Sequence, residues 1–347
     1  MRHHRNNYDA LRLLGALLVL LNHSMELSAQ HGFGFAGQSV STLGVKIFFC
    51  ISGYLVATSW MNDPNPLRFL VRRARRILPA LALVVILGIL VIGPVFTTVP
   101  LAEYFASPMT FRYLGNIVFY VSYALPGVFA TLPIPYALNG SLWTLPVEVT
   151  LYVLVPIYVF AGRRHAAAMV ALFLAAVALS TYFFVQRPAL FAVAGTEFWT
   201  ASTLVPYFVG GALLASLRLE RFLDARLGVA GIVLMHFLAP RLGYGAEIAL
   251  CVVLPYATIA VGRASWLVLR EAGRWGDFSY GIYLWAFPIQ QSIVQVLGTG
   301  IGGLGNAAIA LPLTLGMAAL SYHLVEKRAM RIGMSLRLPV PTAPVTS

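Results

Sequence analysis

The sequence predicts an all-α membrane protein that crosses the bilayer about ten times, with both ends of the chain in the cytoplasm. Three observations support this fold class. Of the 347 residues, 59% are hydrophobic and only 10% are charged, whereas about 25% of the residues of a soluble domain are charged. Apolar runs of about 20 residues recur along the whole chain, as transmembrane helices require. The alternating apolar pattern of a transmembrane barrel is absent from the sequence.

The apolar runs define the expected helices in order. They cover 8–28, 42–60, 78–98, 141–162, 166–185, 202–217, 227–240, 245–262, 277–297 and 304–325. Between the third and fourth runs, the stretch RYLGNIVFYVSYALPGVF is apolar but is cut short by Pro126 and Gly127. We therefore expect a re-entrant or interfacial helix within 99–140, with its backbone covered by protein. Residues 1–332 form one membrane domain, and the Pro-rich tail 333–347 is expected to be disordered and cytoplasmic.

The distribution of positive charge predicts the orientation. The formal net charge is +12, and the basic residues outside the apolar runs lie mostly in the loops on one side. The opposite loops hold only Arg112, Arg187 and Arg241. Because positive loops stay in the cytoplasm, both termini are expected there. No stacking aromatic residues interleave with a basic stripe, so we expect the surroundings to be a lipid bilayer and no nucleic acid to bind.

Cysteine and histidine spacing limits the chemistry. Cys50 and Cys251 both lie in apolar runs, and we expect packed thiols rather than a disulfide. The seven histidines show no metal-ligand spacing. The sequence therefore predicts neither a metal site nor a bound cofactor.

The first apolar run carries ionisable side chains, which are costly within a span and usually face a protein interior or a water-filled cavity. Arg12 and His23 are eleven residues apart, which places them on one helix face, about 16 Å apart along the axis. Asp9 shares this face and can pair with Arg12. The alternative is an arginine that snorkels to the interface and a histidine that only hydrogen-bonds a neighbouring helix.

An arginine cluster precedes the third apolar run, in the stretch FLVRRARRILPAL. Arg73 and Arg76 are three residues apart, so on a helix they point together and can hold one polyanion. The plainer interpretation is ordinary anchoring by a positively charged cytoplasmic loop.

Two further stretches place polar groups at the ends of spans. The stretch NGSLWTLPVEVTLYVLVP puts Trp143 at the interface and Glu148 inside a span. The carboxylate either takes part in chemistry or makes a structural bond to another helix. The stretch FSYGIYLWAFPI groups Ser279, Tyr280 and Tyr283, which we expect to support a site or to form interhelical hydrogen bonds.

These segments together resemble the acyltransferase-3 family of integral-membrane acyltransferases. YDALRLLGALLVLLNHS is similar to the family's segment of an arginine, ten residues and a histidine, at Arg12 and His23. KIFFCISGYL resembles its FF-x-x-SG-[YF] segment, RRARRILPAL its Arg-x-x-Arg segment, and SLWTLPVEVTLYVLVP its W-[ST]-L-x-x-E segment. FSYGIYLWAFPI and HLVEKR resemble its last two segments. The likeness covers 7–331, and the chain departs from the family pattern at Ala286, often a histidine, and at Lys46, often an acidic residue.

The resemblance implies an enzyme of a bacterial inner membrane that moves an acyl group, often acetyl, from cytoplasmic acyl-CoA to a hydroxyl of a carbohydrate or glycolipid. The donor is a co-substrate, with no bound cofactor. His23 would be the base or the acyl carrier, and Glu148 would orient it or bind the acceptor's hydroxyls. Arg12, Arg73 and Arg76 would hold the donor. The supporting residues would be Asp9, Trp143, Ser279, Tyr280 and Tyr283.

Two other classes of protein stay open at the level of sequence. A proton-coupled transporter or flippase of a lipid-linked or sugar substrate would also use Arg, His and Glu within the membrane, although the inverted repeats common in carriers are absent. A non-catalytic subunit that scaffolds glycan assembly would not need His23. Direct transfer, an acyl intermediate and a homo-oligomer are each compatible with the sequence.

Overall fold

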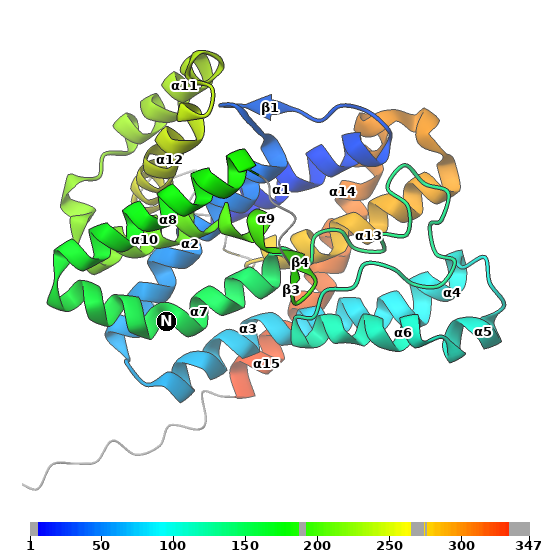
Figure 1. The fold of residues 1–347 in the computed structure, drawn as a ribbon. Helices are drawn as coiled ribbons and strands as arrows, with labels where there is room; N and C mark the ends of the chain where they lie inside the picture. The colour runs from blue at the N-terminus through cyan, green and yellow to red at the C-terminus, as the bar shows by residue number, and fades with distance from the viewer. Residues whose placement is uncertain (1–5, 187–191, 265–273, 275, 333–347) are drawn as a thin grey trace, which may run out of the picture.

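The computed structural model describes residues 6–186, 192–264, 274 and 276–332, and shows a bundle of long helices with two short β-hairpins (Figure 1). In these ranges, nine helical stretches are long and apolar enough to cross a membrane. A tenth long helix, α13, is less apolar because it carries Gln290 and Gln291, both of which are buried. The prediction of an all-α, multi-pass membrane protein is therefore confirmed.

The long helices follow the predicted order. They are α1 (Tyr8–Leu27), α2 (Val40–Asn62), α3 (Pro66–Leu87), α7 (Thr144–Arg164), α8 (Ala166–Gln186), α10 (Val205–Ser216), α11 (Ala225–Leu242), α12 (Gly245–Arg263), α13 (Ser279–Leu297) and α14 (Gly302–Ser321).

Shorter elements extend or connect these helices. They are η1 (Gly88–Ile92), α4 (Gly93–Phe96), α5 (Leu101–Ala106), α6 (Pro108–Tyr113), η2 (Leu114–Val118), α9 (Phe198–Ser202), η3 (Leu219–Phe222), η5 (Thr299–Ile301), η6 (Tyr322–Glu326) and α15 (Lys327–Ile332). The two antiparallel hairpins pair β1 (Gly34–Phe35) with β2 (Gln38–Ser39), and β3 (Ala192–Val193) with β4 (Thr196–Glu197).

Helix α3 begins well before the apolar run that predicted it. The Asn65 side chain caps the helix by accepting a hydrogen bond from the backbone N–H of Arg68 at 3.0 Å, and Pro66 stands in the first turn. Both are preferred residues at these positions. The early start places the whole arginine cluster on a helix. Arg73 and Arg76 therefore lie on one helical surface, as their spacing predicts.

The segment between α3 and α7 is helical only in its first part. The short helices α5, α6 and η2 lie within 99–140, where we expected a re-entrant or interfacial helix. Helical structure ends at Val118, and 119–143 contains no helix. This stretch runs beside α13, where the Gln291 amide donates to the carbonyls of Ile134 and Ala137 at 2.8 and 3.0 Å. Irregular backbone at membrane depth needs such partners. Side chains of α13 therefore supply hydrogen-bond partners for part of this irregular backbone.

Helix α2 lies at the centre of the bundle and contacts α1, α7, α10 and α12. Glycines allow this close packing: a Cβ at Gly44 would lie 2.5 Å from the carbonyl oxygen of Gly15, and a Cβ at Gly53 would overlap the carbonyl of Phe208. Small residues at helix contacts are a common device in membrane proteins. The tight packing fixes the face of α2 that carries Phe48 and Ser52.

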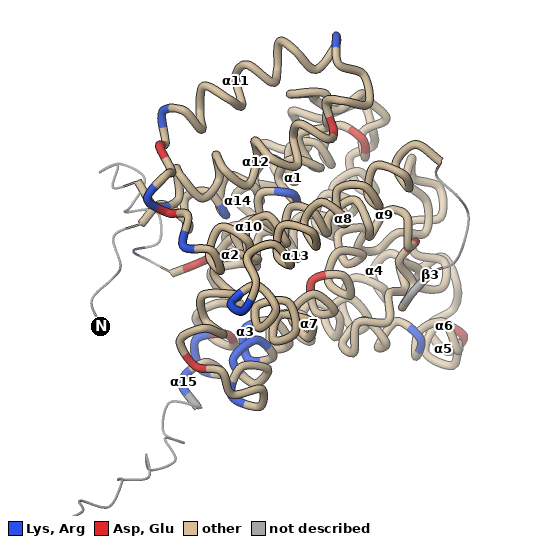
Figure 2. The backbone as a smooth tube through the Cα atoms, turned by 60° about the vertical axis from the view of Figure 1, so that its left-hand side comes forward, with Lys and Arg blue, Asp and Glu red and all other residues tan. Residues whose placement is uncertain are grey.

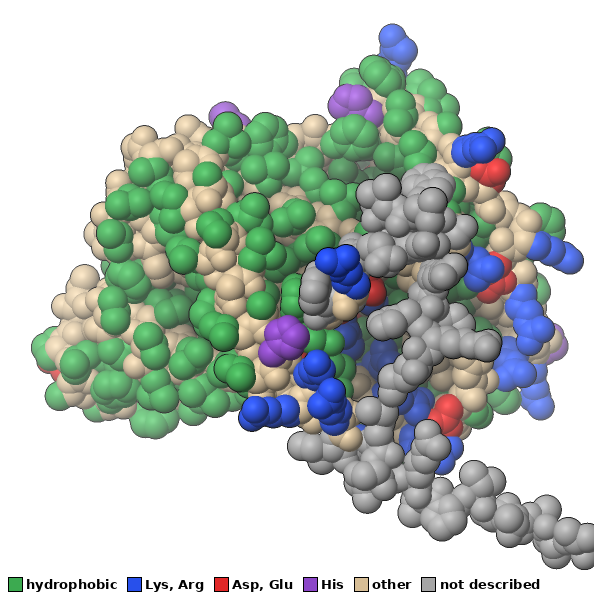
Figure 3. Space-filling model, turned by 180° about the vertical axis from the view of Figure 1, so that it is seen from behind, with side chains coloured by type: hydrophobic (Ala, Val, Ile, Leu, Met, Phe, Trp, Pro, Cys, Tyr) green, Lys and Arg blue, Asp and Glu red, His purple; other side chains and the backbone are tan. Residues whose placement is uncertain are grey.

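The surface separates an apolar face from a basic edge. Figure 3 shows one face dominated by hydrophobic side chains, with Lys and Arg gathered toward one edge. Leu90, Val95 and Ile157 are among the large apolar residues left exposed by the protein, which suits contact with lipid. In Figure 2 the basic residues gather near α3 and α15, the end predicted to be cytoplasmic. The tail 333–347 lies outside the described residues.

Candidate active site

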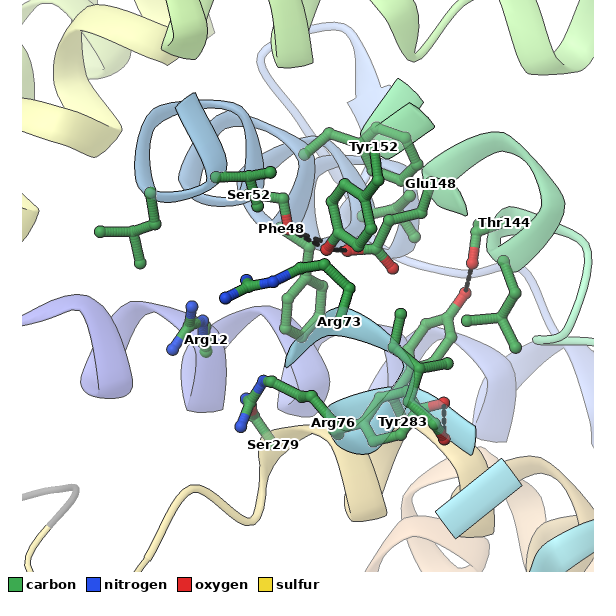
Figure 4. Close-up of a pocket in the computed structure, with 17 residues that line it drawn as sticks. Arg12, Phe48, Ser52, Arg73, Arg76, Thr144, Glu148, Tyr152, Ser279 and Tyr283 are labelled. Atoms are coloured by element: carbon green, nitrogen blue, oxygen red, sulfur yellow. Dashed lines mark hydrogen bonds between the residues drawn. The ribbon is translucent and has the colours of Figure 1, made fainter. Parts of the chain in front are cut away.

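A cavity of about 80 Å³ lies between α1, α2, α3, α7 and α13 (Figure 4). One water needs about 10–15 Å³ on this measure, so the space holds several waters or a small organic group. Seven of the ten site residues predicted from sequence line it: Arg12, Arg73, Arg76, Glu148, Ser279, Tyr280 and Tyr283. Residues from five helices, far apart in the chain, therefore meet at one polar site inside an apolar bundle.

Two of the cavity's arginines are held by one aspartate that the sequence interpretation missed. Asp277 stands just before α13 and pairs with Arg76, and its Oδ2 lies 3.2 Å from Nη1 of Arg12. Asp9 lies 3.3 Å from the same nitrogen of Arg12, as predicted. Burial tends to raise the pKa of Asp277, but attraction by Arg76 and then Arg12 outweighs it and holds that pKa below the usual range. Both guanidinium groups are thus oriented before any ligand arrives.

Arg73 differs from its two neighbours. It makes no ion pair within the described ranges, and its Nε is buried without a hydrogen-bond partner. In Figure 4 its guanidinium extends into the space between Arg12 and the wall formed by Ser52 and Tyr152. A partly buried cation without a counter-ion is costly unless something compensates it. Arg73 is therefore placed to receive an anion from outside the chain.

Opposite the arginines, the cavity wall contains the carboxylate of Glu148, which accepts hydrogen bonds from two neighbouring side chains. Ser52 donates to Oε1 of Glu148 at 2.9 Å, and the Tyr152 hydroxyl donates to the same oxygen. The Tyr152 and Ser52 oxygens are 3.4 Å apart. These bonds leave Oε2 of Glu148 for a ligand. The sequence interpretation missed Ser52 and Tyr152, although Tyr152 lies one helical turn after Glu148 and Ser52 lies in FFCISGYL.

The far end of the cavity is closed by Tyr283. Its hydroxyl lies 2.8 Å from the Thr144 hydroxyl and donates to the carbonyl of Ser141, also at 2.8 Å. The hydroxyl of Tyr280 donates to the carbonyl of Ile77 at 3.1 Å, and Ser279 donates to Asp277. The start of α13 is thus bound to α3 and to the start of α7. The predicted supporting residues of α13 do face the site.

His23 lies apart from this cavity. It is on α1, about three turns beyond Arg12, and its ring meets Phe287 edge-on with centroids 5.2 Å apart. Its Nδ1 is buried and has no hydrogen-bond partner among the described residues. Glu148 is held by Ser52 and Tyr152 instead, so this arrangement does not use Glu148 to orient His23.

The remaining predicted positions have structural contacts. Trp143 precedes α7, and its carbonyl accepts a hydrogen bond from the Thr196 hydroxyl at 2.9 Å. Lys46 pairs with Glu247 at 2.6 Å, and both side chains are 2% exposed. Ala286 is buried in the packing of α1 against α13. Cys50 and Cys251 are buried free thiols, as predicted. No group of three His, Cys, Asp or Glu in the described ranges is placed to hold a metal ion.

Comparison with known proteins identifies the architecture. A family model described as an acyltransferase domain, Acyl_transf_3, matches residues 5–325. The chain is 30% identical over 334 residues to "O-acetyl transferase" of Shigella phage Sf6, covering 94% of this chain and 96% of that one. It is 30% identical over 373 residues to "Nodulation protein 10" of Rhizobium leguminosarum bv. viciae, covering 96% and 95%.

A third relative is longer than this chain. "Putative peptidoglycan O-acetyltransferase YrhL" of Bacillus subtilis is 27% identical over 378 residues, covering 94% of this chain and 55% of that protein. No solved structure matches the chain significantly. The family match spans almost every described helix and includes each residue that lines the cavity. The chain therefore belongs to the acyltransferase-3 family and is a multi-pass membrane enzyme of the O-acetyltransferase kind.

Proposed function

We propose that the protein takes an acyl group, most simply acetyl, from cytoplasmic acyl-CoA and transfers it to a hydroxyl of a carbohydrate or glycolipid at a bacterial inner membrane. The partly buried guanidinium of Arg73, which has no ion-pair partner among the described residues, is the observation on which the donor site rests. Acyl-CoA carries several phosphates, and a guanidinium binds phosphate by paired, charge-assisted hydrogen bonds.

The cavity's size supports a proposal that the two ends of the donor lie in different places. A volume of about 80 Å³ suits an acyl group and the adjoining sulfur, but not a nucleotide. The phosphates would therefore stay at the mouth, where Arg73 receives them and Arg12 and Arg76 add positive charge. Asp277 keeps these two arginines in position but also neutralises part of their charge. Arg73 would therefore be the main contact of the donor's phosphates.

The proposed chemistry needs a base, and we assign this role to His23, which does not line the cavity. A neutral imidazole at His23 would take the proton of the acceptor hydroxyl as the oxygen attacks the thioester carbon. The new C–O bond forms, the C–S bond breaks, and the proton then passes from the imidazolium to the CoA thiolate. Oε2 of Glu148 would bind a hydroxyl of a ligand in the cavity. The position of His23 within a span, with a buried Nδ1 that has no partner among the described residues, supports such a role.

The acceptor class rests on the relatives. The phage and Bacillus proteins carry names that describe O-acetyl transfer, in the second case to peptidoglycan. We extend this to a carbohydrate hydroxyl for the present chain. The orientation also suits such an acceptor, because the arginine cluster lies toward the predicted cytoplasmic end and His23 lies toward the other end of α1.

The test uses the full chain in detergent or lipid discs with acetyl-CoA labelled in the acetyl group, plus a panel of envelope glycans and lipid-linked sugars. We expect one acceptor to gain an alkali-labile label while an equal amount of free CoA thiol is released. Movement of a lipid-linked or sugar substrate across the vesicle membrane, without release of CoA, would overturn the proposal in favour of a transporter or flippase.

A further inference from the structure

The arginine-lined cavity and His23 are separated by aromatic side chains. Tyr283 lines the cavity, and Phe287, which contacts His23, lies one turn further along α13. On α1, Gly15 lies between Arg12 and His23, and the ring of Phe48 from α2 packs against it. The rings of Phe48 and Tyr283 meet edge-on, with centroids 5.9 Å apart. Phe48 and Tyr283 therefore both line the cavity and meet each other on the side where α1 and α13 continue toward His23.

The two sides of this barrier differ in how firmly they are held. Tyr283 is fixed by its contacts with Thr144 and the carbonyl of Ser141, each at 2.8 Å. Phe48 has no polar atom and is half-buried, so only packing restrains its ring. A Cβ at Gly15 would lie 3.2 Å from the Phe48 ring. The same Cβ would lie 3.0 Å from the carbonyl oxygen of Gly44, so Gly15 leaves room for both the ring and the backbone of α2. Of the two aromatic rings, Phe48 is the one that can move.

We propose that Phe48 is a gate that determines which acyl chains pass from the donor cavity to His23, and so a specificity-determining residue for acyl chain length. The inference rests on the proposed function, since it assumes a thioester donor and chemistry at His23. Tyr283 forms the fixed edge of the opening, and the ring of Phe48 forms the movable edge. A two-carbon acyl group needs a small displacement of the ring, whereas each added methylene needs a wider one.

The first test compares Phe48→Ala and Phe48→Leu with the wild type, using acetyl-, butyryl- and hexanoyl-CoA with one acceptor. A single methylene in an apolar pocket changes selectivity by about 10–200-fold. We therefore expect the hexanoyl-to-acetyl ratio of kcat/KM to rise at least about tenfold in Phe48→Ala and less in Phe48→Leu. Phe183→Ala is the matched control, because Phe183 is a buried phenylalanine on the distant helix α8. Its ratio should stay at the wild-type value.

A second variant moves the gate without removing it. Gly15→Ala would press on the ring of Phe48 and on the Gly44 carbonyl of α2, so transfer should fall for all donors. The effect specific to the gate is a lower hexanoyl-to-acetyl ratio than in the wild type. An unchanged chain-length ratio in Phe48→Ala and Gly15→Ala, with active protein, would overturn the gate but leave the proposed function intact. If the wild type releases no CoA from any donor, the proposed function itself fails, and these outcomes are therefore distinguishable.

Discussion

Arg76 of α3 is ion-paired with Asp277, which stands just before α13. This pair joins two elements separated by about 200 residues of chain, and it holds the arginine against the cavity wall. Because Asp277 also binds Arg12 at 3.2 Å, one carboxylate orients two cations while the third, Arg73, stays uncompensated. Asp277 does not line the cavity, yet it neutralises part of the charge of two of the three arginines that do.

Replacing Asp277 by Asn should destabilise the protein by about 1–3 kcal/mol, because two partly buried guanidinium groups lose their partner. The folded-state pKa of Asp277 is lowered, so its stabilisation is present above the unfolded value of about 3.9 and is lost as pH falls toward the lower folded value. Thermal unfolding in detergent from pH 7 to pH 3 should therefore show a gap between wild type and Asp277→Asn that narrows only below about pH 4.

The control for this prediction is Asp63→Asn. Asp63 also pairs with two arginines, Arg68 and Arg72, and its pKa is likewise lowered, with hydrogen bonds from Arg68 as the main cause. It lies at the exposed link between α2 and α3, where ion pairs contribute little. Equal losses of stability in the two variants would show that the Asp277 pairs are no stronger than surface pairs.

Arg73→Ala should weaken acyl-CoA binding by about 1.5–3 kcal/mol, the range for a hydrogen bond to a charged group. Arg73→Lys should restore only part of the affinity because lysine lacks the planar fork. Calorimetric titration with a non-hydrolysable CoA thioether measures both. Arg68→Ala is the matched control, since Arg68 is on the same helix, is 59% exposed and pairs with Asp63. If the two alanine variants bind equally well, Arg73 serves only to anchor the helix.

His23→Ala and His23→Gln should both lose about 10²–10⁴-fold in the rate of acyl transfer, the usual contribution of a general base. Glutamine can hydrogen-bond but cannot titrate, so it separates chemistry from packing. The measurement is the rate of transfer per mole of detergent-stable protein. Near-normal turnover with Gln at position 23 would make the histidine a packing residue and would move the reaction centre elsewhere.

Glu148→Gln should raise the KM for the acyl-CoA donor more than it lowers kcat, because Oε2 is proposed to bind a ligand in the donor cavity while Oε1 is held by Ser52 and Tyr152. Saturation kinetics with the donor give both values. The exposed Glu103 of α5 supplies the control variant, Glu103→Gln. A fall in kcat alone would instead place Glu148 at the reacting atoms.

The ten-span topology predicts that reporter fusions after residues 65, 164 and 222 read cytoplasmic, and that fusions after 34 and 192 read external. The reason is the bias of arginine toward one set of loops. Paired reporters, one active only in the cytoplasm and one only outside it, measure each position. A cytoplasmic reading after residue 34 would contradict the scheme.

Local patterns in the sequence predicted local structure well. The pair of Asp9 and Arg12 follows from a spacing of three residues on one helix, and the grouping of Arg73 with Arg76 follows in the same way. The start of α3 was predicted too late, because the apolar run begins only after the arginines. The signals for the true start are the capping residue Asn65 and Pro66 in the first turn.

Long-range contacts could not be predicted in this way. No periodicity relates Asp277 to Arg12, or Ser52 to Glu148, since each pair meets only through the packing of separate helices. The same limit applies to His23. Arg12 and His23 do lie on the same helix, α1, as the spacing predicts. The aromatic residues between His23 and the cavity, however, come from α2 and α13, and no pattern within α1 predicts them.

The buried pair of Lys46 and Glu247 has a consequence for how this family diverges. Members of the family often carry an acidic residue where this chain has Lys46. Here the Lys46 ammonium pairs with Glu247 and lies over the ring of Tyr207, whose hydroxyl donates to the same carboxylate. An acidic residue at position 46 opposite an unchanged Glu247 would bury two like charges, and loss of either partner leaves one charge uncompensated, at a cost of about 3–5 kcal/mol. The two positions are therefore expected to covary among homologues, so that the sign of one residue predicts that of the other.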